Sequence, residues 1–171
     1  MLGEAFRRVE AGLPLTGADR TNLLRGARLC AAMAAYMPGK AEMQDFKCGE
    51  ALAALGYHDE AIHRYELFLN LAGNNPTDNT MKVVRADAYG LMSASLTATG
   101  KYEPALEAAN TALKAFPHTA AYLIDRGVAE IKLGNAATAR TDLTEAAGIA
   151  AIDDPAKQKA EKLLKTLKAK K

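Results

Sequence analysis

The stretch ATGKYEPA, residues 98–105, ends one predicted helix and begins the next, and it decides the fold. Two related stretches occur in the chain: ALGYHDEA at 54–61 and KLGNAATA at 132–139. In each of the three, a glycine precedes an alanine by five residues. Ala105 and Ala139 lie 34 residues apart, whereas Ala61 and Ala105 lie 44 apart. A period near 34 residues is typical of stacked helical hairpins, so we predict an all-α fold.

Composition supports a small globular chain with no membrane span. The 171 residues are 49% hydrophobic and 25% charged, which suits one domain or a short repeat array. No apolar run approaches the roughly 20 residues that cross a bilayer, and the N-terminus lacks the apolar stretch of a secretory signal. Cys30 and Cys48 fall on apolar helix faces without metal-binding spacing, so we expect buried, reduced thiols. Together these features favour a cytoplasmic location.

Basic charge is confined to the end of the chain. The net charge is +2, but residues 155–171 carry seven Lys and one Glu, so the other 154 residues carry −4. Within this tail, apolar residues recur at helical spacing and form one stripe: Ala156, Ala160, Leu163, Leu164 and Leu167. The pattern predicts an amphipathic helix that covers the end of the repeats.

Periodicity and turn residues divide the rest of the chain into helices. The expected ranges are 3–12, 16–36, 41–55, 59–72, 80–99, 104–116, 119–133, 136–150 and 154–171. Polar side chains between Thr16 and Asp19 are candidates to cap the second range, and Asn79 or Thr80 to cap the fifth. Pro104 suits the first turn of its helix, where the missing N–H costs nothing. No stretch alternates with period two, so no strand is expected.

These repeated residues resemble the tetratricopeptide repeat (TPR), an antiparallel pair of helices 34 residues long. Residues 86–119 match best, and their matching positions are Leu96, Gly100, Tyr102, Ala105, Ala109, Ala112, Leu113 and Pro117. Related units begin near Glu42 and at Ala120; the latter departs from the pattern at Glu130, which Arg126 could pair. The resemblance implies a right-handed solenoid of three TPR-like hairpins over residues 41–153, with an insertion at about 73–85. Residues 1–40 supply N-terminal helices, compatible with a degenerate leading repeat, and 154–171 a Lys-rich capping helix.

The resemblance also implies a binding surface on the first helix of each hairpin. In this family that helix lines a concave groove that holds a peptide or a helix of another protein. The matching positions are Met43, Phe46, Glu50, Ala53, Asp87, Gly90, Ala94, Thr97, Ala121, Ile124, Val128 and Ile131. We expect Phe46, Ile124 and Val128 to anchor an apolar or amphipathic segment there. The alternative is that the N-terminal helices of the same chain fill the groove.

One ligand class of the family is disfavoured. Repeats that clasp the acidic C-terminal tails of chaperones use basic and amide side chains in this groove. The corresponding positions here are Phe46, Glu50, Leu91, Ala121 and Asp125, which include two acids and no Lys, Arg or Asn. We therefore expect no binding of chaperone tails. The insertion at 73–85 either is neutral or contacts the ligand at the edge of the groove.

No catalytic pattern emerges from the sequence. His58 and His63 are five residues apart, which places them off the common helix face that a zinc-binding pair shares, and no Gly-rich phosphate loop occurs. We expect no enzyme activity, no metal and no cofactor.

Protein binding in the groove is the leading functional hypothesis, and two other hypotheses stay open. One is a chaperone-like adaptor for a secreted or assembling subunit, by analogy with uses of the fold. The other is contact with an anionic surface or nucleic acid through Lys157, Lys162, Lys165 and Lys168. A solvated face of a capping helix is the simpler interpretation of these lysines, and nucleic acid is a less favoured partner because no aromatic residue lies among them. A homodimer through apolar helix faces is compatible with the sequence.

Overall fold

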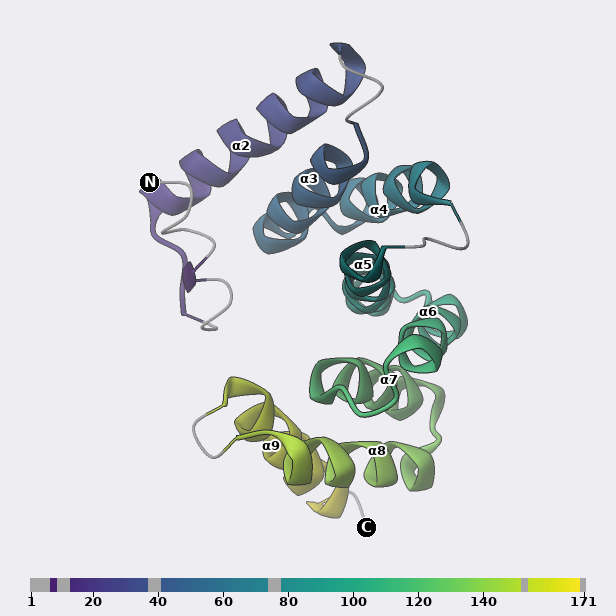
Figure 1. Ribbon diagram of the computed structural model, residues 1–171. Coiled ribbons are helices and arrows are strands. Elements are labelled where there is room, and N and C mark those ends of the chain that lie inside the picture. Colours follow the sequence, from purple (N-terminus) through teal and green to yellow (C-terminus); the bar gives the residue numbers. More distant parts are fainter. Residues whose placement is uncertain (1–6, 9–12, 37–40, 74–77, 152–153, 170–171) are drawn as a thin grey trace. The chain divides into compact units, whose positions relative to one another are not determined.

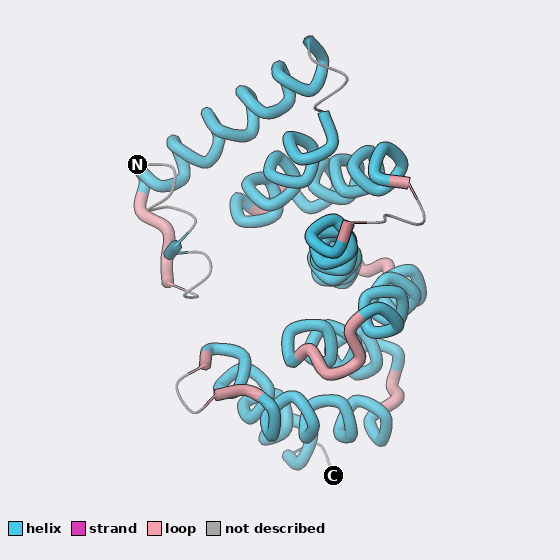
Figure 2. The backbone as a smooth tube through the Cα atoms, in the orientation of Figure 1, coloured by secondary structure: helices cyan, strands magenta, loops and turns pink. Residues whose placement is uncertain are grey.

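The chain folds into helices joined by short connections (Figures 1 and 2). The structure is a computed structural model, and it describes residues 7–8, 13–36, 41–73, 78–151 and 154–169. Within these ranges no strand occurs. The helices are α2 (Gly17–Tyr36), α3 (Ala41–Leu55), α4 (His58–Ala72), α5 (Asn79–Ala98), α6 (Tyr102–Ala115), α7 (Ala120–Leu133), α8 (Ala136–Ile149) and α9 (Pro155–Ala169). The all-α prediction is confirmed. Apart from residues 7 and 8, the helix expected at 3–12 lies outside the described residues, as does part of the insertion, 74–77.

Two compact units make up the chain: Met1–Ala88 and Tyr89–Lys171. Helix α5 passes through the boundary, so its first half belongs to the first unit and its second half to the second. Each unit has its own buried core, and the two are described separately below.

The three glycine turns have one common geometry. Gly56, Gly100 and Gly134 all have positive φ angles, of 88°, 81° and 86°. The next residue donates its backbone N–H to the carbonyl five residues earlier: Tyr57 to Leu52 (2.9 Å), Lys101 to Leu96 (2.9 Å) and Asn135 to Glu130 (2.8 Å). This is the hydrogen bond of a Schellman motif, which needs a left-handed residue and therefore favours glycine. The repeated stretches thus end three helices in the same way.

Small residues bring the two helices of each hairpin together. Ala61, Ala105 and Ala139, five residues after the glycines, are each 0% exposed. The residues that contact the second helix from the preceding one are also small: Gly49, Ser93 and Gly127. Tyr65 packs over Gly49, the Ser93 hydroxyl donates to the Ala105 carbonyl at 2.8 Å, and Leu143 packs over Gly127. Because these side chains are short, the backbones approach closely and the crossing excludes water.

In the first unit, α2 begins with reciprocal side-chain caps and packs on α3. The Asp19 N–H donates to the Thr16 hydroxyl (3.2 Å), and the Thr16 N–H donates to the Asp19 carboxylate (2.9 Å). Arg20 donates to the Leu55 carbonyl and the Cys48 thiol to the Ala27 carbonyl, both at 3.3 Å. Because Arg20 meets Leu55 and Ala27 meets Cys48, residue numbers rise along α2 where they fall along α3, and the two helices are antiparallel.

The cap of α5 differs from the expectation. The Met81 N–H donates to the Asp78 carboxylate at 2.9 Å, so Asp78 caps the helix rather than Asn79 or Thr80. An ionised carboxylate at this position also complements the positive end of the helix dipole.

In the second unit, ionic side chains join α7 to α8. The Arg126 guanidinium makes two 2.7 Å bonds to the Asp142 carboxylate, which is 2% exposed. The expected pairing of Arg126 with Glu130 is not the one found, because Glu130 instead accepts from the Asn135 amide at 2.6 Å. The Asp142 carboxylate accepts both bonds in a bidentate arrangement, which is stronger than a single hydrogen bond to an arginine.

Helix α9 packs against α8 and reaches α7. Its first turn is capped by Asp154, whose carboxylate accepts the Ala156 N–H at 2.8 Å. Ala160 is fully buried, while Leu163, Leu164 and Leu167 are half-buried. The stripe predicted from the sequence therefore contains the residues of α9 that the fold covers.

Candidate functional site

In the first unit, the expected groove positions include both accessible and buried side chains. Met43 is 36% exposed, and Glu50, Ala53 and Asp87 are half-buried. Phe46 is only 5% exposed. The Glu50 carboxylate pairs with the Lys47 ammonium at 2.7 Å, so its charge is partly neutralised locally.

Phe46 belongs to an aromatic cluster in the core. Its ring centroid lies 6.2 Å from that of Tyr65 and 5.4 Å from that of Phe68, both of which are 0% exposed. Tilted rings at these separations are a favourable packing arrangement. Burial, aided by the nearby Glu50 charge, raises the pKa of Tyr65 above its usual range, so its phenol stays protonated. The anchoring role expected for Phe46 is corrected to a core role.

In the second unit, an accessible set of uncharged side chains lies on α5 and α7. Ala94 and Ala121 are exposed, and Thr97, Val128 and Ile131 are half-buried. Ile124 is 1% exposed, so it too is a core residue and not the expected anchor. Of the three expected anchors, Val128 alone retains an accessible side chain.

Gly90 is buried where α5 meets α7. A β-carbon at Gly90 would lie 2.8 Å from the Tyr122 ring and 3.8 Å from the Asp125 carboxylate. Gly90 therefore does not line a groove, because its lack of a side chain is what allows α7 to approach. This contact places Ala94, one helical turn beyond Gly90, and Val128, three residues beyond Asp125, near the junction of the two helices.

Asp125 lies at this junction, and its surroundings shift the pKa of its carboxyl. Burial raises the pKa of its carboxyl to about 7, although the Lys159 ammonium, 3.9 Å away on α9, favours the charged form. The Lys159 side chain is itself 58% exposed, so this pair is a weak one. Asp125 thus presents less negative charge than the sequence suggests.

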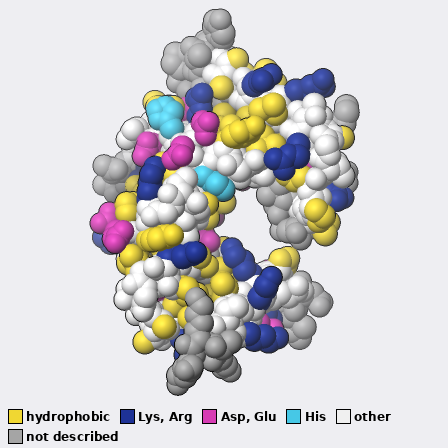
Figure 3. All heavy atoms as spheres, turned by 180° about the vertical axis from the view of Figure 1, so that it is seen from behind, with side chains coloured by type: hydrophobic (Ala, Val, Ile, Leu, Met, Phe, Trp, Pro, Cys, Tyr) yellow, Lys and Arg dark blue, Asp and Glu magenta, His cyan; other side chains and the backbone are white. Residues whose placement is uncertain are grey.

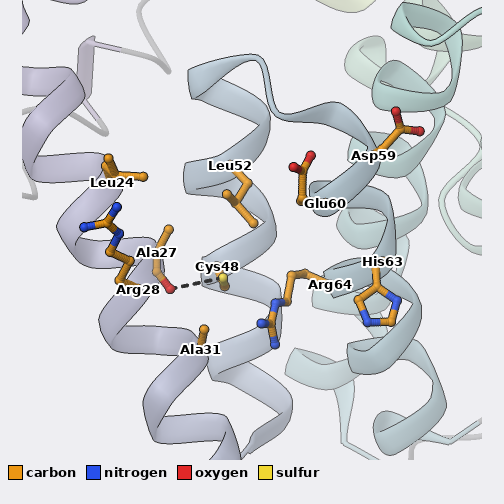
Figure 4. A pocket seen from close by; sticks show the side chains of 10 residues that line it. All are labelled: Leu24, Ala27, Arg28, Ala31, Cys48, Leu52, Asp59, Glu60, His63 and Arg64. Atoms are coloured by element: carbon orange, nitrogen blue, oxygen red, sulfur yellow. Dashed lines mark hydrogen bonds between the residues drawn. The ribbon is translucent and has the colours of Figure 1, made fainter.

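A groove that the sequence did not reveal lies in the first unit, between α2 and α4 and above α3 (Figure 4). We call it the α2–α4 groove; its volume is about 480 Å³ and it opens to solvent. Its floor is apolar and comes from α2 and α3: Leu24, Ala27, Ala31, Cys48 and Leu52. Burial raises the pKa of the Cys48 thiol, which keeps it protonated and unreactive.

The rim of the α2–α4 groove consists of ionisable side chains. Its members are Arg28 from α2 and Asp59, Glu60, His63 and Arg64 from α4. Arg64 also pairs with Asp45 on α3 at 2.9 Å, and Asp45 is 3% exposed. No sequence motif marks this site, because it needs three successive helices and residues 40 positions apart. The expected helical spacing on α2 was the available signal: Leu24, Ala27 and Ala31 share one face.

The lysines of α9 differ in accessibility. Lys162 and Lys165 are exposed, and Lys157 is half-buried. The side chain of Lys168 lies outside the described ones. Exposed lysines thus lie on α9 apart from its buried stripe.

No group of three or more His, Cys, Asp or Glu residues placed to hold a metal ion occurs in the part of the chain that the structure describes. Among the described helices, none is long and apolar enough to cross a membrane. Comparison with protein-family models gives no match, and comparison with curated proteins gives none either.

Proposed function

We propose that this chain is a non-catalytic protein-interaction module that binds an apolar or amphipathic segment of another protein on the α5–α7 face of its second unit. The observation that carries the proposal is the accessible uncharged set Ala94, Ala121, Val128 and Ile131 on two helices in contact. Two branched side chains beside two exposed alanines provide both apolar area and room for close approach.

Helix surfaces of this kind favour a helical or extended partner over a small molecule. Small residues let another backbone approach, and half-buried Val128 and Ile131 still have apolar atoms to cover. The resemblance to TPR hairpins points to the same face. The local acid, Asp125, is mostly covered and lies beside Lys159, so it adds little repulsion toward an apolar segment.

Affinity purification of the tagged full chain, followed by mass spectrometry, tests the proposal. We expect Val128→Glu and Ala94→Arg each to lower recovery of the specific partner at least tenfold, because a charge on this face must be desolvated on binding. Ala137→Arg, at an exposed position of α8, is the control and should recover the partner normally. Circular dichroism checks that each variant stays helical. Unchanged recovery by both α5 and α7 variants contradicts the proposal.

The exposed lysines of α9 support a second candidate function, contact with an anionic surface or nucleic acid. Lys162 and Lys165 lie away from the buried stripe and are free to meet phosphates. If this contact operates, Lys162→Gln together with Lys165→Gln should weaken binding to anionic vesicles or RNA and reduce its salt dependence. Binding that does not weaken with added salt excludes this function.

A further inference from the structure

The α2–α4 groove has the dimensions of a helix-binding site. The α2 residues of its floor run from Leu24 to Ala31, a separation of seven residues or about 10 Å along the helix. That distance equals the spacing from i to i+7 on a facing helix, the range over which amphipathic helices place their apolar anchors. Because the groove opens to solvent, it would leave much of a small ligand exposed, whereas a helix could bury one face and leave the other in water.

Apolar and charged groups are arranged for an amphipathic partner. Figure 3 shows the molecule from behind, and in its upper part hydrophobic side chains gather between Lys and Arg on one side and a mixed group of acidic, basic and His side chains on the other. The floor residues Leu24, Ala31 and Leu52 are half-buried, so a partner would cover apolar atoms that now meet water.

The rim charges change sign along the groove. Glu60 and Asp59 lie at the end marked by Leu24 and Leu52, whereas Arg64 lies toward the end marked by Ala31 (Figure 4). Arg28 lies between these ends on α2 and is exposed, whereas the charge of Arg64 is already paired with Asp45 at 2.9 Å. The groove therefore carries acidic charge at the Leu24 end and the basic charge of Arg28 farther along α2. A partner with a single sign of charge would meet a like charge at one of these places.

Helices most readily carry acidic residues in the first turn and basic residues in the last, because these charges complement the helix dipole. Such a helix matches the rim if its first turn lies near Arg28 and its last turn near Glu60. Residues 24 to 31 and 59 to 64 both run from the acidic end to the basic end, so α2 and α4 are parallel (Figure 4). The matching helix then runs antiparallel to both.

We propose that the α2–α4 groove is a second docking site, which takes an amphipathic helix of a partner protein with acidic residues in its first turn and basic residues in its last turn. Apolar side chains at i, i+3 or i+4, and i+7 of that helix would cover Leu24, Ala31 and Leu52. The site is separate from the α5–α7 face and does not depend on it.

The probes for the test are three fluorescent peptides of about 11 residues with one common apolar face, a length that places the centres of the first and last turns about 10 Å apart. The first has Glu in its first turn and Lys in its last, the second has Glu at both ends, and the third has Lys at both ends. Fluorescence anisotropy with the full chain measures their dissociation constants. We expect the first peptide to bind about threefold to fivefold more tightly than either of the others, the effect of one exposed ion pair gained or lost.

Exposed rim residues allow variants that leave the core intact. Glu60→Lys should weaken the first peptide about threefold to fivefold and strengthen the peptide with Glu at both ends by a similar factor. Arg28→Glu should weaken the first peptide and strengthen the peptide with Lys at both ends. The matched controls are Glu66→Lys on α4 and Arg25→Glu on α2, which are exposed and outside the groove, and they should change no affinity beyond twofold.

Three results overturn the proposal: no peptide binds at millimolar concentration, the rim variants act like their controls, or Ala31→Glu leaves the affinity of the first peptide unchanged. Analytical ultracentrifugation adds a further arm. If the chain dimerises and Ala31→Glu abolishes the dimer, the groove belongs to a second copy of the chain and not to a partner helix. Loss of peptide binding in Ala31→Glu, with a monomer in both proteins and unchanged circular dichroism, supports the proposal.

Discussion

Gly49 and Tyr65 lie so close that a β-carbon on Gly49 would be 2.5 Å from a carbon of the tyrosine ring. Tyr65 is completely buried and packs against Phe46, which in turn packs against Phe68, so the tyrosine ring has little room to move. We expect Gly49→Ala to destabilise the chain by about 1–3 kcal/mol through overpacking.

Gly148→Ala is the matched control, since it also lies in a helix but has no atom within 4 Å of the added carbon. It should be neutral or stabilise by up to about 1 kcal/mol, because alanine is the better helix former. Urea unfolding followed by circular dichroism measures both changes. If Gly49→Ala and Gly148→Ala change the free energy of unfolding equally, the Tyr65 ring moves aside at little cost and overpacking is not the cause.

The turn glycines with positive φ angles lead to a second prediction about stability. Gly134 has φ of +86° with nothing within 4 Å, so Gly134→Ala suffers only from backbone strain. The expected loss is about 1–2 kcal/mol, and Gly100→Ala should match it because the turns are alike. Gly17→Ala, which also meets nothing within 4 Å, is the control and should not lower the melting temperature. If Gly100→Ala and Gly134→Ala lower the free energy of unfolding by markedly different amounts, the two turns do not impose the same backbone strain.

Asp125 predicts a pH dependence of stability. Its pKa is raised to about 7 from an ordinary value of 3.8, so between these values the folded chain holds a proton that the unfolded chain releases. The stability is therefore greatest below about pH 4 as far as this group is concerned, and it falls as the pH rises through 7. One pKa unit corresponds to about 1.4 kcal/mol, so the full loss is up to about 4 kcal/mol.

Asp125→Asn should flatten this dependence between pH 5 and 8, as measured by urea unfolding at each pH. Lys159→Met should steepen it above pH 7, because Lys159 favours the charged carboxylate. Glu103→Gln, which removes an exposed carboxyl, serves as the control. A pH profile that Asp125→Asn leaves unchanged rules out Asp125 as its source.

Arg126 and Asp142 provide a test of a partly buried ion pair. Arg126→Met leaves the Asp142 carboxylate, which is 2% exposed, without its main partner, and we expect a loss of about 3–5 kcal/mol. Adding Asp142→Leu should recover a large part of that loss, because no buried charge is then left unpaired. A double-mutant cycle from urea unfolding measures the coupling between them. Additive effects of the two changes would mean that the pair contributes no interaction of its own.

The turns and helix ranges were predictable because they depend on local chemistry. A glycine in the left-handed region and an alanine five residues later can be recognised from spacing alone, and α2 through α9 begin and end within about two residues of expectation. Helix caps were harder. Asp78, Asn79 and Thr80 are all suitable capping residues, and only the backbone path shows that Asp78 accepts the bond.

The candidate sites were less predictable because burial depends on partners far along the chain. Phe46 has the helix position of a groove residue, but the rings of Tyr65 and Phe68 draw it into the core. Ile124 also has the helix position of a groove residue, yet its side chain is 1% exposed. The α2–α4 groove required knowledge that α2 packs on α3, and the leading segment has only a weak repeat pattern.

The ion pairs of the two outer hairpins have opposite polarity. In the first, Asp45 on α3 pairs with Arg64 on α4; in the last, Arg126 on α7 pairs with Asp142 on α8. Arg64 and Asp142 both lie three residues after the buried alanine of their helix, so if α8 packed on α3 in place of α4, Asp142 would stand where Arg64 now pairs with Asp45. Chains built from similar hairpins are prone to such misassembly. The opposite order of charge in the two pairs therefore favours packing of each helix on its own partner. Two hairpins of similar backbone geometry are thus not interchangeable.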